Sequence, residues 1–345
     1  MTVEGTTPPT VSRGIPLGSI STGHHATLLG LGAYRPRRVV TNEEVCEHLE
    51  VDAAWVHARS GISTRRRAEA GETVVAMGAA AARDALAAAG IAAADVAVTL
   101  VATMSADTGC PQVGTRLAAE IGATNGAAMD VGAACAGFCY ALEVAASLVD
   151  AGHGAVLVVG VERMSDIVEP TDRSTAFLFG DGAGAVVVGP SAEPGVGPAA
   201  WGADGTQAGL IAQSVTWAEA HATGERPALR MQGPTVFRWA TSRMVPLVFE
   251  ALEKAGCKPE QLDAFVPHQA NARITDGLVK ALALPDHVTV ARDVAVTGNT
   301  SAASVPLAMH DVLTTGGARP GDLALLCGFG AGLTFAAQVV SLPPV

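Results

Sequence analysis

Long apolar runs without polar alternation recur along the chain, separated by alanine-rich or amphipathic stretches. Such runs are typical of strands that are buried on both faces of a sheet. The predicted strands are residues 26–34, 96–105, 127–131, 155–162, 183–190, 262–268, 288–294 and 323–332. The predicted helices are residues 42–60, 73–90, 112–122, 135–151, 235–256, 271–283 and 300–315. Strands and helices that alternate in this way predict an α/β fold.

The order of these elements is repeated. A strand–helix–strand–helix–strand series fills residues 96–162, and the same series fills residues 262–329. This repeat is far longer than a solenoid unit and predicts a duplicated half-domain. In such a fold Cys135, His268 and Asn299 lie at strand ends or helix starts, on one edge of the assembly. We expect an N-terminal leader at 1–25, a first half at 26–194 and a second half at 195–345.

The composition excludes several classes of protein. Apolar residues make up 49% of the 345 residues and charged residues 16%, which suits a large core and not a disordered chain. The formal net charge of −11 argues against nonspecific nucleic-acid binding. An anionic ligand would therefore have to bind at a local basic patch.

The chain has no recognisable targeting or membrane segment. No apolar run approaches the ~18–20 residues that a membrane helix needs, and the first residues do not resemble a secretion signal. The six cysteines are scattered without a CxxC pair, which predicts reduced thiols and neither disulfides nor a metal site. We expect a cytoplasmic protein with no membrane or nucleic-acid partner.

Cys135 is the strongest candidate for chemistry. It lies among small residues in VGAACAGF, between a predicted strand and a predicted helix. A thiol at a helix N-terminus has a lowered pKa because of the helix dipole and the free N–H groups there. The alternative is a buried structural cysteine, which is common and which we expect for Cys139, one turn further on.

Three further segments carry candidate groups. His268 ends an apolar strand and precedes a polar turn that opens a helix, where α/β folds place their sites. Asn299 precedes another helix and is equally well suited to be a plain N-cap. The glycine-rich segment 328–332 can bring backbone N–H groups close to a ligand.

Five motifs together resemble one family. They are CAGF around Cys135, PHQAN around His268, GNTSAAS around Asn299, FGDGAG at 179–184 and FGAGLT at 329–334. In their order along the chain they resemble the β-ketoacyl-acyl-carrier-protein synthase III family of the thiolase superfamily, over about residues 26–343. The resemblance implies a thiolase-like duplicated αβαβα five-layered sandwich and a homodimer.

The resemblance also implies a reaction. Cys135 takes an acyl group from acyl-CoA, which is a substrate, so that no cofactor or metal is needed. The backbone N–H groups of Cys135 and Ala331 form an oxyanion hole, although many relatives have glycine where this chain has Ala331. Malonyl-acyl-carrier protein then loses CO2, and His268 and Asn299 donate hydrogen bonds to its enolate. Asparagine suits this role because aspartate would repel the charge and offer no donor.

Other positions match the family more loosely. Trp55 and Arg173 match the pair that encloses the adenine of CoA, and a residue that packs a helix is the alternative for Trp55. Cys110 matches the position that limits the acyl pocket across the dimer interface, and its small side chain predicts a roomy pocket. The full CoA-binding set is Trp55, Arg59, Arg173, Phe237 and Asn271, and the phosphate and carrier-protein rim is Arg238, Arg273 and Lys280.

Alternative functions share these motifs. A sibling enzyme that primes polyketides with an unusual starter has the same residues. An acyltransferase that moves the acyl group to a hydroxyl or amine without condensation has less need of His268 and Asn299. A scaffold without activity would not need the three polar groups. Thiolase would require a second cysteine in the C-terminal turn, whereas Cys327 lies inside the strand before that turn.

Overall fold

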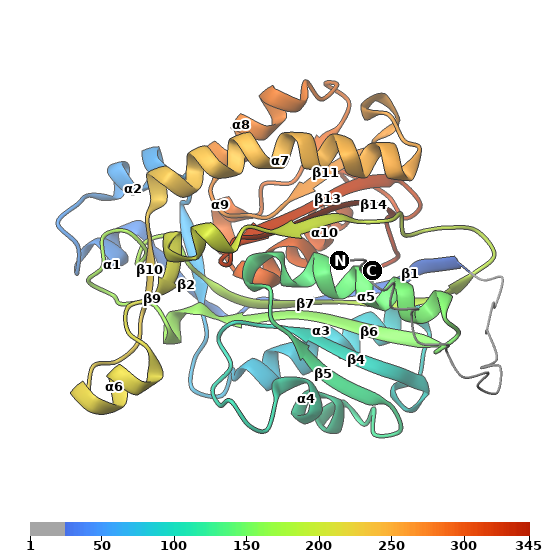
Figure 1. Ribbon diagram of the computed structural model, residues 1–345, viewed down its shortest axis with the longest axis horizontal. Helices are drawn as coiled ribbons and strands as arrows, with labels where there is room; N and C mark the ends of the chain where they lie inside the picture. The colour runs from blue at the N-terminus through green and yellow to red at the C-terminus, as the bar shows by residue number, and fades with distance from the viewer. Residues whose placement is uncertain (1–24) are drawn as a thin grey trace, which may run out of the picture.

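The computed structural model describes residues 25–345, which form five alternating layers of helices and sheets (Figure 1). Two five-stranded sheets lie on either side of a central helix layer, and further helices cover the outer face of each sheet. The predicted sandwich fold is therefore confirmed. The predicted leader lies outside the described residues except for His25, which opens the first strand.

The first sheet has the strand order β1-β7-β6-β4-β5. β4 pairs in parallel with β5 and β6, whereas β7 pairs antiparallel with β6 and β1. Its strands are β1 (His25–Tyr34), β4 (Val96–Ala102), β5 (Ala127–Val131), β6 (Ala155–Arg163) and β7 (Asp181–Ser191).

The second sheet repeats this topology with the order β8-β14-β13-β11-β12. β11 pairs in parallel with β12 and β13, and β14 pairs antiparallel with β13 and β8. Its strands are β8 (Ala200–Ala203), β11 (Ala264–Pro267), β12 (Thr289–Val290), β13 (Leu323–Gly330) and β14 (Thr334–Ser341). Each strand thus has a counterpart at the same place in the first sheet, and the sequence repeat predicts three of these pairs, β4 with β11, β5 with β12 and β6 with β13.

Two helices fill the central layer, α5 (Gly137–Asp150) and α10 (Ser304–Thr314). Their apolar residues form one core with the inner faces of both sheets, which explains why the strands are apolar on both sides. The outer helices are α3 (Val74–Ala89) and α4 (Val113–Ile121) on the first sheet and α7 (Gly233–Ala255) and α8 (Ala272–Leu282) on the second.

The sequence misplaced some elements. The single helix predicted over 42–60 is two helices, α1 (Asn42–Cys46) and α2 (Ala53–Ser60), because Asp52 caps the second one with its carboxylate. The strand predicted over 288–294 is only the two-residue β12. After it the chain turns into the short helix α9 (Val294–Thr297).

Several smaller elements were not predicted. β2 (Arg38–Thr41) pairs with β3 (Thr64–Arg67), and β9 (Ile211–Gln213) pairs with β10 (Leu229–Met231). α6 (Trp217–Thr223) connects β9 to β10 and projects from the lower left of Figure 1. Within residues 25–345, no helix combines the length and apolar character that crossing a bilayer requires.

Candidate active site

Cys135 lies in a tight turn between β5 and α5. The turn spans Ala134–Ala136, and Ala134 has a φ of 45°, which is unusual for a residue other than glycine. The turn packs on β13 of the other half, where Gly330 is so close that an added Cβ would lie 2.7 Å from the Cys135 nitrogen. The first half of the fold thus supplies the thiol, and the second half supplies the surface on which it rests.

The glycine-rich turn after β13 passes beside the thiol. The Thr334 hydroxyl lies 2.8 Å from the carbonyl oxygen of Ala133 and 3.0 Å from that of Ala331, so that it joins this turn to the Cys135 turn. Ala331 has a negative φ, and within residues 330–332 only Gly332 has a positive one, at 132°. The methyl group of Ala331 therefore fits the turn without backbone strain.

His268 follows β11 and is fixed on both sides. Its backbone N–H donates to Cys327 at 2.6 Å, and its ring packs edge-on against Phe329. Nδ1 lies 2.6 Å from the hydroxyl of Ser304, at the start of α10. Burial lowers the pKa of the His268 ring to about 3, so the ring is neutral at physiological pH.

Asn299 lies between α9 and a second tight turn, Ser301–Ala303. Its backbone N–H donates to Leu178 at 2.8 Å, and its carbonyl oxygen accepts from Gly180 at 3.0 Å. Oδ1 accepts the N–H of Ser301 at 2.9 Å, which leaves the Nδ2 amide group free to donate. The FGDGAG motif therefore contributes through its backbone, by holding Asn299 in place.

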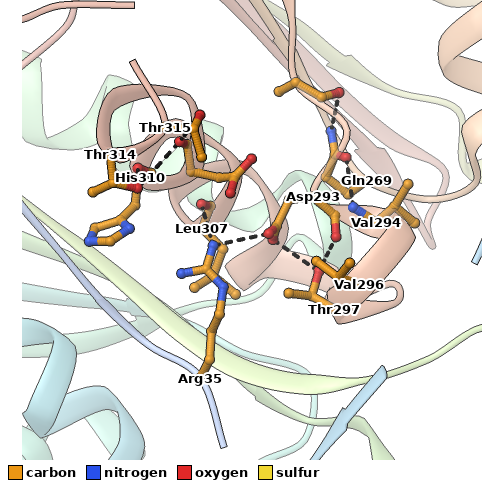
Figure 2. A network of polar contacts seen from close by, with 12 residues as sticks. Arg35, Gln269, Asp293, Val294, Val296, Thr297, Leu307, His310, Thr314 and Thr315 are labelled. Atoms are coloured by element: carbon orange, nitrogen blue, oxygen red, sulfur yellow. Dashed lines mark hydrogen bonds and ion pairs between the residues drawn. The ribbon is translucent and has the colours of Figure 1, made fainter. Parts of the chain in front are cut away.

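Gln269 links His268 to the segment that carries Asn299. Its side chain donates to the carbonyl oxygens of Pro267 and Ala291. It also accepts the N–H of Val294, at the start of α9 (Figure 2). Asp293, just before α9, accepts from Arg35 and Thr297 in the same figure. These buried contacts fix the relative positions of His268 and Asn299.

A narrow cavity of ≈ 40 Å³ joins the predicted catalytic groups. Cys135, His268, Asn299 and Ala331 all line it, and the remaining lining residues are predominantly apolar. Burial raises the pKa of the Cys135 thiol to about 12. The lowered pKa expected from the helix start is therefore wrong for this site, because desolvation of the buried thiol is the largest influence on its pKa.

A wider cavity of ≈ 480 Å³ lies next to the first. Both cavities are lined by Met231, Val236, Ala270 and Asn299, so they form one channel from the surface to the thiol. The wide part is lined by seven residues of the predicted ligand-binding set, namely Trp55, Arg59, Arg173, Phe237, Arg238, Asn271 and Arg273.

Cation–π contacts hold side chains in place in the wide part of the channel, which we call its mouth. Arg173 lies 4.9 Å and Arg59 5.3 Å from the Trp55 ring centre, and Arg273 lies 5.8 Å from the ring centre of Phe237. The Asn271 amide donates to the Arg59 carbonyl oxygen and so connects α8 to α2. Four arginines at one opening give this acidic protein the local basic patch that an anionic ligand requires.

Two predicted residues lie outside the channel. Lys280 is exposed two turns beyond Arg273 on α8, and it does not line the wide cavity. Cys110 is exposed on the loop after β4 and lines neither part of the channel within this chain. Its proposed role invokes a second subunit and stays a prediction.

The remaining buried thiols are structural. Cys139 packs in the central core, and Cys327 packs in the core between the second sheet and α7 and α8. Neither lines the channel. Cys327 therefore does not occupy the position that a second thiolase cysteine would need.

Sequence reasoning missed the residues that support the site. Ser304 and Thr334 lie inside the motifs GNTSAAS and FGAGLT, but their partners, His268 and the two turns at the thiol, become visible only in the fold. Glu162, at the end of β6, is fully buried beside the Ser301–Ala303 turn. A fully buried carboxyl is unusual, but its sequence context, VVGVER, gives no sign of burial at that position.

The duplicated fold and this facing set of cysteine, histidine and asparagine define a condensing enzyme of the thiolase superfamily. The family models 3-oxoacyl-[acyl-carrier-protein] synthase III and its C-terminal region match residues 129–205 and 252–342. The chain belongs to the β-ketoacyl-[acyl-carrier-protein] synthase III family.

Similar proteins cover almost the whole chain. Beta-ketoacyl-[acyl-carrier-protein] synthase III 1 of Streptomyces coelicolor is 49% identical, over 92% of this chain and 97% of its own. The synthase III of Streptomyces glaucescens is 51% identical over the same shares. Among solved structures, the priming β-ketosynthase of the R1128 polyketide pathway has a TM-score of 0.90 at 48% identity, covering 93% of this chain and 97% of that one. The synthase III of Aquifex aeolicus has a TM-score of 0.85 at 35% identity, covering 92% and 99%.

Proposed function

We propose that this protein is a β-ketoacyl-acyl-carrier-protein synthase III. Acyl-CoA first acylates Cys135, and malonyl-acyl-carrier protein then condenses with the acyl group to give 3-oxoacyl-acyl-carrier protein, CoA and CO2. The observation that carries this proposal is the channel, which leads from an arginine-lined mouth to Cys135, His268 and Asn299.

Acyl transfer requires a nucleophile and an oxyanion hole. The thiol of Cys135 attacks the thioester carbon, and the N–H groups of Cys135 and Ala331 stabilise the developing oxyanion. The close packing of Gly330 on Cys135 supports this role, because it brings the turn with Ala331 beside the thiol. CoA leaves through the wide part of the channel.

Condensation requires donors for an enolate. The hydrogen bonds of Asn299 leave Nδ2 free, and Ser304 at Nδ1 of His268 leaves Nε2 as the donor that faces the cavity. With the ring neutral, both groups donate without adding a proton to the carbanion. The carbanion attacks the acyl carbon, and Cys135 leaves as the thiolate.

The relatives include a polyketide-priming ketosynthase as well as synthase III enzymes, and the acyl primer distinguishes these two roles. The protein should be incubated with a panel of acyl-CoA thioesters and its intact mass measured. We expect one acyl adduct that is absent in Cys135→Ala and that malonyl-acyl-carrier protein discharges with release of CO2. Absence of any adduct contradicts the proposal, and discharge without CO2 identifies a plain acyltransferase.

We also propose that the protein forms a homodimer. β5 is an edge strand of the first sheet, and Met129 in it is 42% exposed. Unpaired apolar edge strands favour pairing with another chain. The acyl-pocket role of Cys110 depends on this dimer, because within one chain Cys110 does not reach the channel. A monomer mass in analytical ultracentrifugation would contradict both.

A further inference from the structure

The first step of the proposed reaction needs a base. A thiol whose pKa is raised to about 12 by burial is protonated at neutral pH, and only the thiolate is a good nucleophile. His268 is a poor acceptor, since burial lowers its pKa to about 3 and Nδ1 already lies against Ser304. Another buried group must take the proton from Cys135.

Glu162 is a candidate for this group. It is fully buried at the end of β6, where four residues donate hydrogen bonds to it. The Met104 N–H donates at 3.1 Å, the Ser105 hydroxyl at 2.5 Å and the Thr103 hydroxyl at 3.2 Å. The Ala302 N–H approaches from the other half of the fold at 3.4 Å. Burial raises the pKa of this carboxyl to about 7, so it can gain or lose a proton near neutral pH.

Ser301 belongs to the turn that contacts both the Cys135 turn and this carboxyl. It is fully buried, and its hydroxyl has no hydrogen bond of standard geometry to any described residue. The hydroxyl is nevertheless near enough to lower the pKa of both Cys135 and Glu162. Its backbone has a φ of 47°, a sparsely populated conformation for serine. The Ser301–Ala303 turn packs directly on the Ala134–Ala136 turn.

The charged surroundings single out this pair. Cys135 is the titratable group that faces Glu162 from the packed turn, whereas Thr103–Ser105 and Ser301–Ala303 are uncharged. At the start of the neighbouring strand β7, Asp181 binds Ser165 and Ala68, and Arg163, which follows Glu162 in β6, pairs with Asp166. The negative charge of Glu162 also raises the pKa of the thiol, and that opposition disappears once Glu162 is protonated.

We propose that Ser301 relays the proton of Cys135 to Glu162. This inference rests on the proposed function, because it assigns a proton acceptor to its acyl-transfer step. The S–H proton moves to the Ser301 oxygen while the Ser301 O–H proton moves to the Glu162 carboxylate. The thiolate then forms the S–C bond to the acyl carbon, and the bond from that carbon to sulfur of CoA breaks, releasing the CoA thiolate.

The second half-reaction resets the relay. The malonyl group loses CO2, and its bonding electrons form the new C–C bond to the acyl carbon. The S–C bond to Cys135 breaks, so that the negative charge of the malonyl carboxylate ends on the Cys135 thiolate. Glu162 returns its proton through Ser301 to this sulfur. One proton is stored per cycle, and the CoA thiolate takes its own proton from solvent.

Two variants test the relay independently. Glu162→Gln keeps the shape of the side chain but cannot accept a proton, and the hydroxyls of Thr103 and Ser105 can rotate to accept from its amide. Ser301→Ala removes a hydroxyl that has no standard hydrogen bond, and Ala134 shows that this fold accepts alanine at a similar φ. The matched control is Thr275→Val, which removes another buried, unpartnered hydroxyl on α8.

The measurements are single-turnover acylation by acyl-CoA and alkylation of Cys135 by iodoacetamide, each against pH. In the wild type both rates should rise with pH through about 7, because Glu162 must be ionised to accept the proton. Glu162→Gln and Ser301→Ala should slow acylation roughly 10²–10⁴-fold with an unchanged Kd for acyl-CoA. The step near pH 7 should disappear in Glu162→Gln and remain in Glu162→Asp and in the control.

The outcomes distinguish the proton relay from the proposed synthase III function. Folded variants that keep the wild-type rate and pH profile overturn the relay and leave the proposed function intact. A wild type that no acyl-CoA acylates overturns the proposed function, and the alkylation profile then still decides the relay. If Glu162→Gln fails to fold, Ser301→Ala alone decides, since it leaves the carboxylate in place.

Discussion

The side chain of Asn299 is oriented by one hydrogen bond. Because Oδ1 accepts the Ser301 N–H, Nδ2 is the atom that can donate to substrate. Asn299→Asp keeps this acceptor and replaces the donor by a second oxygen. We expect decarboxylation and condensation to fall roughly 10²–10³-fold, the usual loss for one donor to a developing oxyanion. Acylation of Cys135 should change far less, since it precedes enolate formation.

The measurement is CO2 release from malonyl-acyl-carrier protein, set against the rate of adduct formation by mass spectrometry. An equal loss in both half-reactions would show that Asn299 serves mainly to support Cys135.

The tautomer of His268 depends on Ser304. The Ser304 hydroxyl accepts the N–H of Gln269 at 3.3 Å, so its own proton is free to be donated to Nδ1 of the ring. Ser304→Ala removes this control and leaves a buried N–H without a partner, at a cost of about 1–3 kcal/mol of folding stability. We expect a lower kcat for condensation with little change in KM. Ser304→Thr should restore most of kcat, whereas loss of stability alone would lower the yield of folded enzyme and leave kcat unchanged.

At the scale of elements, the contact between β13 and the Cys135 turn requires glycine. A Cβ at position 330 would lie 2.8 Å from Cβ and 3.1 Å from Sγ of Cys135. Gly330→Ala should therefore push the thiol from its place and abolish the acyl adduct. Gly71→Ala is the control, since a Cβ added there meets no atom within 4 Å other than those of Gly71 and its two neighbours in the chain. The test is the intact mass of each variant after incubation with acyl-CoA. A normal acyl adduct in Gly330→Ala would contradict the expectation that glycine is required at this contact.

Because the fold is duplicated, the contact between a tight turn and a strand of the other half occurs twice. Gly160 in β6 lies against Ala302 in the same way that Gly328 in β13 lies against Ala136, and Ala134 and Ser301 share a left-handed φ. Each half therefore places its tight turn on the sheet of the other. The first half uses its turn for the nucleophile, and the second uses its turn for Asn299 and the proposed relay.

Much of the fold could be predicted from sequence because the central layer is buried on both sides. Strands such as β6 consist almost entirely of apolar residues, and that signal does not depend on distant partners. β14 was missed although it is equally buried. It contains Gln338, which has no exposed surface and whose amide donates to Gly197, a contact that the sequence cannot reveal.

The residues of the site likewise divide into some that could be predicted from sequence and some that could not. The placement of Cys135, His268 and Asn299 around one cavity could be predicted because each of them lies in a recognisable motif. Ser304, Ser301 and Glu162 are ordinary residue types, and their neighbours lie more than 30 positions away in the chain. The family pattern places Lys280 in the rim, but two helical turns, about 11 Å, separate it from Arg273.

At the scale of the whole molecule, an ion pair with a buried carboxylate joins the two halves. Arg35, just after β1, donates to Asp293 at 3.0 Å and to the Leu307 carbonyl oxygen at 2.9 Å (Figure 2). The Asp293 side chain is 1% exposed. Arg35→Met should destabilise the fold by about 3 kcal/mol, because it leaves a buried carboxylate without its cation.

The double variant Arg35→Met/Asp293→Asn should be more stable than the sum of the single changes predicts, since no unpaired charge remains. Urea denaturation of the four proteins measures this coupling. Strict additivity would show that the pair contributes nothing across the halves.

The net charge of −11 makes the arginine mouth an exception on this molecule. An acidic carrier protein would be repelled by most of the surface and attracted only there, so the mouth sets the encounter rate. Arg273→Glu should raise KM for malonyl-acyl-carrier protein about tenfold at low salt. Added salt should reduce this difference in KM between the variant and the wild type, because exposed charges are screened. Lys280→Glu makes the same charge change on the same helix, outside the wide cavity, and should raise KM less. Equal effects of the two substitutions would mean that the surface that binds the carrier protein extends along α8, as the family pattern predicts. The residues that line the channel would then not define that surface alone.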